Sequence, residues 1–250
     1  MLKVYLFDFK KAKKILYYAL TAILSAVITI AALIGFDHVF YNPTSEVGAE
    51  AKRIDTVIID AGHGGEDCGA IGTNGVYEKD INLAVSILLK EELESRGYNV
   101  IMTRTEDKML YSEQENIKGM RKLSDLKNRC GIANEHPDAL LVSIHMNSFG
   151  ASEYSGLQVY YATDNSESRA LASAIQDSVR NTIQKENTRS VKDGSGLYIL
   201  DNSEPTSVII ECGFLSNAAE CEKLSQKEYQ KELSLSIVCG IISYIENKQG

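Results

Sequence analysis

Two histidines and two glutamates stand beside the apolar runs of this sequence, where polar side chains are able to meet. Three of them follow short apolar runs that are typical of buried strands: His63, His145 and Glu211. The fourth, Glu78, comes just before an apolar pattern with helical spacing. Ligand crevices of open α/β sheets lie at the carboxyl ends of the strands. We therefore expect separated segments to deliver these side chains to one region.

Two imidazoles and one carboxylate form a ligand set for catalytic Zn²⁺, with one position left for water. Another carboxylate, not bound to the metal, is then needed to take the proton of that water. The four side chains supply such a set, with one glutamate as ligand and the other as base. The residues alone also leave open that the histidines are ordinary hydrogen-bonded residues at strand ends, since their spacing fits no short zinc motif.

Other candidate sites are weaker. His38 lies beside a long apolar block and His136 lies in a turn before Pro137, so we expect both to be incidental. The glycine-rich stretch 62–75 is reminiscent of phosphate-binding loops. It lacks the Lys-Ser/Thr pair of a P-loop and the glycine order of a dinucleotide fold, so phosphate binding is not expected.

Alternating strands and helices are predicted to position the four residues. The expected strands cover 56–60, 99–103, 139–144, 157–161 and 207–210, and the expected helices cover 80–96, 123–134, 169–182 and 227–247. A strand–helix–strand unit at the start predicts parallel pairing with a right-handed crossover. The fold class is therefore α/β, a single domain with a central, mostly parallel mixed sheet flanked by helices. The polar segment 105–122 is expected to form a long loop or exposed helix that could cover the site.

An uncharged apolar block of 22 residues, 15–36, precedes this domain. As a helix it would be about 33 Å long, enough to cross the hydrocarbon layer of a bilayer. Four lysines lie directly before the block, which predicts a cytoplasmic N-terminus. The predicted organisation is a basic cytoplasmic segment 1–14, a transmembrane signal anchor 15–36, a linker 37–53 and an extracytoplasmic catalytic domain 54–250. A buried core helix, or a cleaved signal peptide followed by secretion, are the alternatives.

Charge and cysteine content exclude several classes of function. The chain of 250 residues has a net charge of −8, and residues 1–36 carry five Lys and one Asp, so the remaining 214 residues carry −12. An acidic domain repels polyanions, so nucleic-acid binding is not expected. The 5 cysteines are odd in number and form no CxxC pair. Neither a disulfide framework nor a zinc ribbon is predicted, and we expect free thiols.

Seven segments of the chain resemble, in order, the zinc-dependent N-acetylmuramoyl-L-alanine amidases. The resemblance extends over residues 54–246. Its motifs are VIIDAGHGG at 57–65, EKDINL at 78–83, TRTED at 103–107, NRCGIAN at 128–134, SIHMNS at 143–148, GLQVYY at 156–161 and ECGFLSN at 211–217. Residues 108–125 depart from the family pattern.

The resemblance implies both a site and an activity. It implies that His63, Glu78 and His145 bind Zn²⁺ and that Glu211 is the catalytic carboxylate. It implies hydrolysis of the peptidoglycan amide bond between N-acetylmuramic acid and L-alanine. A zinc peptidase acting within the stem peptide and a non-catalytic peptidoglycan-binding scaffold remain alternatives.

The predicted architecture is similar to that of one subgroup of these amidases. A lone catalytic domain behind one membrane anchor is similar to the germination-specific amidases of spore formers. This similarity implies action on spore-cortex peptidoglycan before muramic-δ-lactam formation. The expected partners are peptidoglycan, the membrane and an accessory protein.

Overall fold

The computed structural model describes residues 54–249 apart from residue 164, together with Lys14, Tyr17, Tyr18, Leu20 and Ser25. Within these described parts of the chain, no helix is long and apolar enough to cross a membrane. The predicted linker and nearly all of the predicted membrane span at 15–36 lie outside the described residues. The anchor therefore stays a prediction.

A six-stranded mixed sheet forms the centre of the described domain, with the strand order β2-β1-β3-β6-β4-β5. The strands are β1 (Thr56–Ala61), β2 (Asn99–Met102), β3 (Leu140–Asn147), β4 (Gln158–Tyr161), β5 (Lys192–Asp193) and β6 (Thr206–Phe214). Strands β2, β1, β3 and β6 pair in parallel, whereas β4 runs antiparallel to β6. The predicted α/β class with a mostly parallel mixed sheet is confirmed.

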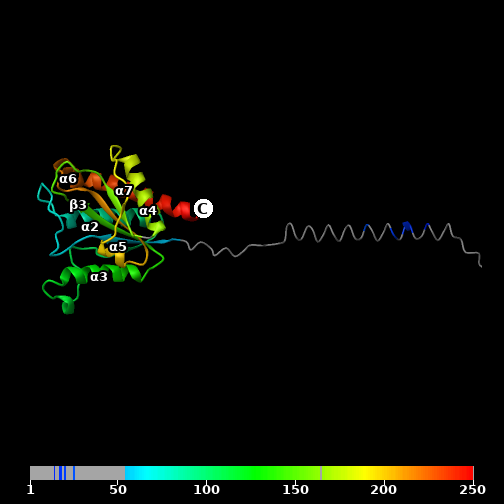
Figure 1. The fold of residues 1–250 in the computed structure, drawn as a ribbon, viewed down its shortest axis with the longest axis horizontal. Coiled ribbons are helices and arrows are strands. Elements are labelled where there is room, and N and C mark those ends of the chain that lie inside the picture. Colours follow the sequence, from blue (N-terminus) through cyan, green and yellow to red (C-terminus); the bar gives the residue numbers. More distant parts are fainter. Residues whose placement is uncertain are drawn as a thin grey trace, which may run out of the picture. The chain divides into compact units, whose positions relative to one another are not determined.

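Helices cover both faces of this sheet (Figure 1). They are α2 (Glu78–Ser95), α3 (Arg121–Asn134), α4 (Ser166–Thr182), α5 (Tyr198–Asn202), α6 (Ala218–Leu224) and α7 (Lys227–Gln249), with a 3₁₀ turn η1 (Glu113–Glu115). Strand side chains alternate between the faces, so Val57 and Ile59 enter the larger core cluster with residues of α2, α4 and α7. Ile58 enters the smaller cluster with residues of α3 and α5.

The predicted elements are confirmed in kind but not in every boundary. Strands β3 and β6 do not end at Ile144 and Ile210 as expected; they continue to Asn147 and Phe214. Within this extension His145 pairs with Glu211 across the two strands. Both strands stay extended beyond their apolar runs because each supplies backbone hydrogen-bond partners for the other. Helices α5 and α6 were not predicted, since segments of 5 and 7 residues are too short to display a helical period.

Candidate metal centre

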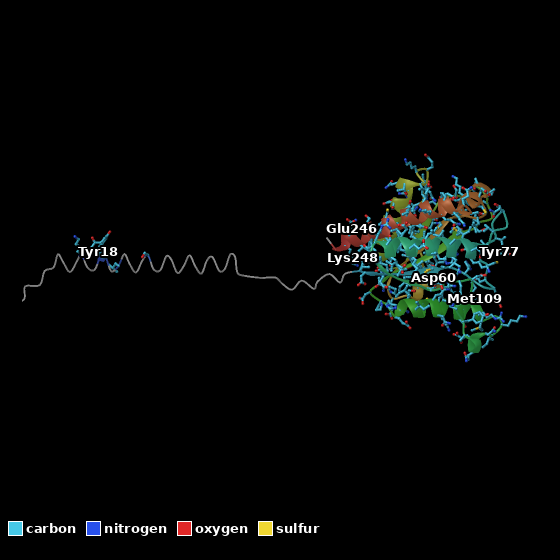
Figure 2. The ribbon with its side chains drawn as sticks, turned by 180° about the vertical axis from the view of Figure 1, so that it is seen from behind. Tyr18, Asp60, Tyr77, Met109, Glu246 and Lys248 are labelled. Atoms are coloured by element: carbon cyan, nitrogen blue, oxygen red, sulfur yellow. The ribbon has the colours of Figure 1, made fainter. Side chains whose placement is uncertain are left out.

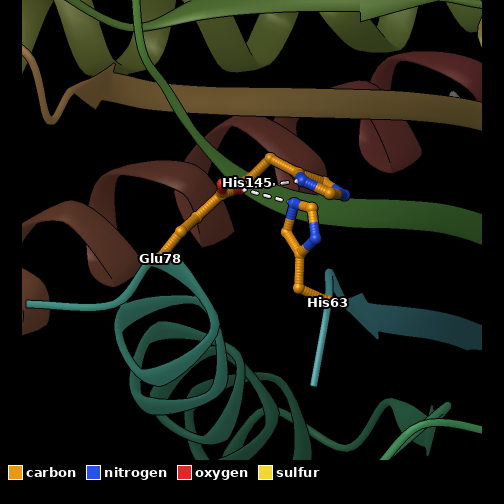
Figure 3. A group of neighbouring side chains, drawn as sticks. All are labelled: His63, Glu78 and His145. Atoms are coloured by element: carbon orange, nitrogen blue, oxygen red, sulfur yellow. Dashed lines mark hydrogen bonds and ion pairs between the residues drawn. The ribbon is translucent and has the colours of Figure 1, made fainter. Parts of the chain in front are cut away.

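Three of the four predicted site residues converge at the carboxyl end of the sheet. His63 follows β1, Glu78 is the first residue of α2, and His145 belongs to β3. Nε2 of His63 lies 3.2 Å and Nδ1 of His145 lies 3.0 Å from Oε1 of Glu78 (Figure 3). One ligand atom from each residue lies within 4.8 Å of the other two.

This donor set fits a zinc ion. Ligand atoms that lie about 2.0–2.1 Å from one tetrahedral ion are about 3.3–3.4 Å apart, close to the separations between Glu78 and the two imidazoles. The carboxylate of Glu78 is held from behind, because Oε2 accepts from the amide of Ala70 at 2.8 Å and Oε1 accepts from the amide of Met146 at 3.1 Å. Burial favours the neutral acid, but the hydrogen bonds and charges of His145 and His63 lower the pKa of Glu78 overall.

His63 is held in an unusual backbone conformation. Its φ is 62°, a left-handed value that side-chain-bearing residues rarely adopt. Its second ring nitrogen, Nδ1, lies 2.9 Å from Oδ2 of Asp67, which also lies 3.1 Å from Nζ of Lys122. Such a carboxylate behind an imidazole fixes the orientation of a metal-binding ring.

The two carboxylates beside His63 set the proton affinity of its ring. Burial disfavours the imidazolium, but the hydrogen bonds and charges of Asp67 and Glu78 prevail and raise the pKa of His63 to about 9. An imidazole binds a metal only after losing this proton. Metal binding here is therefore expected to release a proton.

Two glycines make the space that the ligands occupy. A Cβ on Gly62 would lie 2.3 Å from Cε1 of His145, and a Cβ on Gly69 would lie 2.5 Å from Oε2 of Glu78. Gly69 also has a φ of +65°. Any side chain at either position would displace a ligand, which gives a packing reason for the glycines of this loop.

Two buried arginines hold the loop that carries His63. Arg104 donates through Nε to the carbonyl of Ala61 at 2.8 Å and through Nη2 to the carbonyl of Gly62 at 3.0 Å. Arg129 donates through Nη1 to the carbonyl of Ala61 and through Nη2 to the carbonyl of His63, both at 2.7 Å. These bonds satisfy backbone carbonyls at the end of β1 and in the loop that follows it.

The charge of Arg129 is balanced by Asp60, which lies in the interior of the domain (Figure 2). Oδ1 of Asp60 accepts from Arg129 and from Thr103, both at 2.7 Å, and Oδ2 accepts from Ser143 at 2.6 Å. Burial would raise the pKa of Asp60, but Arg129 and the hydroxyl donors lower it to about 2. Removing one partner of such a buried pair typically costs about 3–5 kcal/mol, so the network is a rigid support for the loop.

Glu211 stands opposite His145 on the neighbouring strand. Its Oε2 is buried and makes no hydrogen bond with any described residue. Burial is the largest cause that raises the pKa of Glu211. The charges of His145 and His63 oppose it and the charge of Glu78 adds to it, so that the pKa is raised overall. A carboxylate oxygen without a protein donor is free to accept a proton from a substrate or a water.

The neighbouring thiol belongs to the opposite face. Cys212 is fully buried in the larger core cluster, and burial raises its pKa well above the usual range. It therefore cannot act as a thiolate nucleophile. The cysteines Cys68, Cys130, Cys212, Cys221 and Cys239 are all free, as predicted.

The remaining predicted candidates lie elsewhere. His136 is exposed and belongs to no metal-binding group among the described residues, and His38 is not described. Of the polar segment 105–122, residues 105–120 form a loop with one 3₁₀ turn and the last two begin α3. Asp107 of this segment accepts from the amide of Gly65 at 2.7 Å, so the segment borders the loop that carries His63. Whether it closes over the site stays a prediction.

The residues that support the site were not identified from the sequence. Asp60, Arg104 and Arg129 belong to the motifs and Asp67 follows the first of them, but none of the four received a role. A signal was present for one of them, because a charged residue at the end of an apolar strand requires a buried partner. Which of many arginines would supply that partner depends on the packing of α3.

Comparison with known proteins adds to this geometry. Residues 57–243 match the protein family described as N-acetylmuramoyl-L-alanine amidase. The germination-specific N-acetylmuramoyl-L-alanine amidase of Bacillus subtilis is 35% identical over 192 residues, which cover 77% of this chain and 80% of that protein.

Solved structures agree with this match. The CwlD amidase from Clostridioides difficile, solved in complex with the GerS lipoprotein, is 40% identical with a TM-score of 0.75, over 77% of this chain and 99% of that chain. The catalytic domain of CwlV, an N-acetylmuramoyl-L-alanine amidase from Bacillus (Paenibacillus) polymyxa, is 29% identical with a TM-score of 0.65, over 77% of this chain and 99% of that chain.

Proposed function

The chain belongs to the N-acetylmuramoyl-L-alanine amidase family, and from this membership we propose that it uses zinc to hydrolyse the amide bond between N-acetylmuramic acid and L-alanine. The observation that carries the proposal is the set of ligand atoms of His63, Glu78 and His145, which lie within 4.8 Å of one another. The buried, unpartnered oxygen of Glu211 beside this set is what a general base requires.

The proposed mechanism assigns one task to each residue. A zinc ion held by His63, Glu78 and His145 would lower the pKa of a water and polarise the scissile carbonyl. Glu211 takes the proton of the attacking water on its free oxygen and later gives it to the leaving amine of L-alanine. Asp67, Arg104 and Arg129 do not touch the substrate in this scheme; they keep His63 oriented.

A role in the spore cortex is the second part of the proposal. Support comes from the similarity to the germination-specific amidase of Bacillus subtilis and to the CwlD amidase. Removal of the stem peptide frees the lactyl carboxylate of muramic acid. This is the group that a muramic-δ-lactam requires, so we propose that the chain acts before lactam formation.

The test of the activity is digestion of purified cortex peptidoglycan followed by mass spectrometry of the muropeptides. We expect intact stem peptides with a free L-alanine N-terminus, together with glycan strands whose muramic acid carries a free carboxylate. A zinc peptidase would instead give shortened stems that remain attached to the glycan. A scaffold would release nothing, and either of these results would overturn the proposed bond specificity.

An accessory protein and a membrane anchor complete the proposal. The CwlD amidase was solved in complex with a lipoprotein, and we propose that this chain also acts with an accessory protein. The uncharged block 15–36 supports an anchor that holds the catalytic domain outside the cytoplasmic membrane; secretion after signal cleavage is the alternative.

Removal of residues 1–36 should leave the domain folded and active in solution. The expectation has a structural reason, because among the described residues the core clusters are built from Ile54 onwards. Gel filtration, circular dichroism and hydrolysis of muropeptides by the truncated protein would check it. Aggregation of that protein, or loss of its helical signal, would mean that the apolar block is part of the folded core.

A further inference from the structure

A cleft of about 640 Å³ lies outside the metal-binding set, on the other side of β6 from β3. Its walls come from four places: the loop after β3, the loop after α4, helix α6 with the residue before it, and the first turn of α7. Glu220 of α6 ties two of the walls together, since its carboxylate accepts from the amides of Gly156 and Phe214 at 2.8 and 2.7 Å. The cleft is therefore built from fixed backbone.

Arg189 is the cation best fixed in this cleft. Its backbone amide donates to Asn187 at 2.9 Å, and its carbonyl accepts a short hydrogen bond of 2.5 Å from Arg180. Its guanidinium lies 4.5 Å from the ring centroid of Phe214, and Nε donates to the carbonyl of Ser155 at 2.7 Å. The head group is thus pre-organised before any ligand arrives.

One edge of this guanidinium remains available. Nη1 donates to Oε1 of Gln158 at 3.3 Å, and Nη2 makes no hydrogen bond with any residue that the structure describes. A planar guanidinium with free N–H groups is suited to a carboxylate, which it can bind through two parallel hydrogen bonds.

The other charged residues of the cleft carry both signs. Lys185 and Lys223 add positive charge, and Glu153 and Glu186 add negative charge. The carboxylate of Glu220 is occupied by two backbone amides, and burial raises its pKa, although these bonds and Arg189 lower it in part. An anion that enters the cleft meets three cations and three carboxylates, of which that of Glu220 is already bonded to two backbone amides.

A row of three aromatic side chains leads from Arg189 to Phe149. Phe149 follows His145 by four residues and is 60% exposed. Its ring centroid lies 5.3 Å from that of Tyr154, which lies 6.1 Å from that of Phe214, the ring under Arg189. Phe214 itself follows Glu211 by three residues in β6.

The sheet register gives a second measure of this proximity. Gln158, which accepts from Arg189, pairs with Glu211 across β4 and β6. Residues that face one another on neighbouring antiparallel strands lie about 4.5–5.5 Å apart, so Arg189 bonds to the side chain that stands next to Glu211. A stem peptide that leaves the metal centre in extended form covers about 3.3–3.6 Å per residue. It needs only a few residues to reach the cleft.

We propose that Arg189 binds a carboxylate of the stem peptide, and that the aromatic row guides this peptide arm of the substrate away from the metal centre. The proposal rests on the proposed amidase function and adds a specificity-determining residue to it. The chemistry selects the peptide over the glycan, because stem peptides carry carboxylates whereas N-acetylated sugars joined to a stem carry none. The acidic group on the second stem residue, directly after L-alanine, is the one we assign to Arg189.

The test uses two soluble N-acetylmuramoyl tripeptides with amidated C-termini. One carries a free α-carboxylate on its second, glutamyl residue, and the other carries a carboxamide there. The zinc-loaded wild-type protein should hydrolyse the carboxylate substrate with a kcat/KM about 10–100-fold higher, mostly through KM. Arg189→Gln should lose this preference and leave hydrolysis of the carboxamide substrate nearly unchanged, with Arg189→Lys between the two.

Arg169→Gln is the matched control, since Arg169 also lies over a tyrosine ring, at 5.9 Å from that of Tyr161, and does not line the cleft. It should keep the wild-type preference. Hydrolysis of both substrates at equal rates by the wild type would overturn the proposal even if Arg189→Gln failed to fold. So would an equal loss on both substrates in Arg189→Gln, which would indicate a role for Arg189 in glycan binding or loop structure. If the wild type hydrolysed neither substrate, the proposed amidase function itself would be in error.

Discussion

Replacing Glu211 with Gln should lower the rate of amide hydrolysis by at least ~10²-fold while the protein keeps its zinc, because loss of a general base typically costs 10²–10⁴-fold. Glutamine preserves the size of the side chain and one carbonyl oxygen, but it cannot accept a proton. Oε2 of Glu211 makes no hydrogen bond with the described residues, so the exchange breaks no bond that supports the fold. Muropeptide hydrolysis, zinc content and thermal unfolding measured on one sample would check the three parts of this expectation.

Two outcomes would contradict the assignment. Near-normal turnover in Glu211→Gln would show that another group takes the proton. Loss of zinc from this variant would make Glu211 a ligand instead of a base. Cys212→Ser serves as the control for a thiol mechanism, because Cys212 follows Glu211 but faces the larger core cluster. That variant should stay active, with at most a modest loss of stability.

The domain could be predicted from sequence wherever apolar residues are periodic over a sufficient length. The run 56–60 and the pattern after Asp80 gave β1 and α2 almost to their ends, because β1 is buried on both faces and α2 buries one face. The ends of β3 and β6 could not be found this way. His145 and Glu211 are polar and not completely buried, and only the pairing of one strand with the other keeps them extended.

The candidate site could also be predicted only in part from the sequence. Residue type and position near strand ends sufficed to select His63, His145 and Glu211, because parallel strands place their carboxyl ends together. Geometry is needed to explain why His63 is held in place. The left-handed backbone at this residue is held by Arg129, which lies 66 positions further along the chain, and the ring faces Asp67 four positions away. No local pattern in the sequence reports the contact with Arg129.

The support behind the ligands also explains why the four residues have to be tested separately. Glu78 accepts from backbone amides, and Nδ1 of His63 lies 2.9 Å from Oδ2 of Asp67, so neither depends on the metal alone for its position. His145 differs from them. Its ring packs over Gly62, and among the described residues its side chain contacts Glu78 and the ring of His63, at a centroid distance of 5.0 Å. Removal of the His145 side chain therefore breaks the fewest contacts outside the proposed metal-binding set.

Replacing His145 with Ala should remove zinc and activity together. Only His63 and Glu78 would remain, and two protein ligands fall short of the three that catalytic zinc sites use. We expect zinc affinity to fall by more than the about 10–100-fold that loss of an outer partner of a ligand costs. Zinc content after dialysis against a chelator, followed by muropeptide hydrolysis with and without added zinc, would measure both effects.

His136→Ala is the matched control for this variant, since His136 is exposed and stands outside the ligand set. It should retain stoichiometric zinc and wild-type hydrolysis. Full metal occupancy in His145→Ala would refute the ligand assignment, and loss of the helical signal in circular dichroism would trace its inactivity to folding. Compared with Glu211→Gln, which should keep its zinc and lose its rate, the histidine variant separates metal binding from proton transfer. Loss of zinc in both variants would mean that the metal centre includes Glu211.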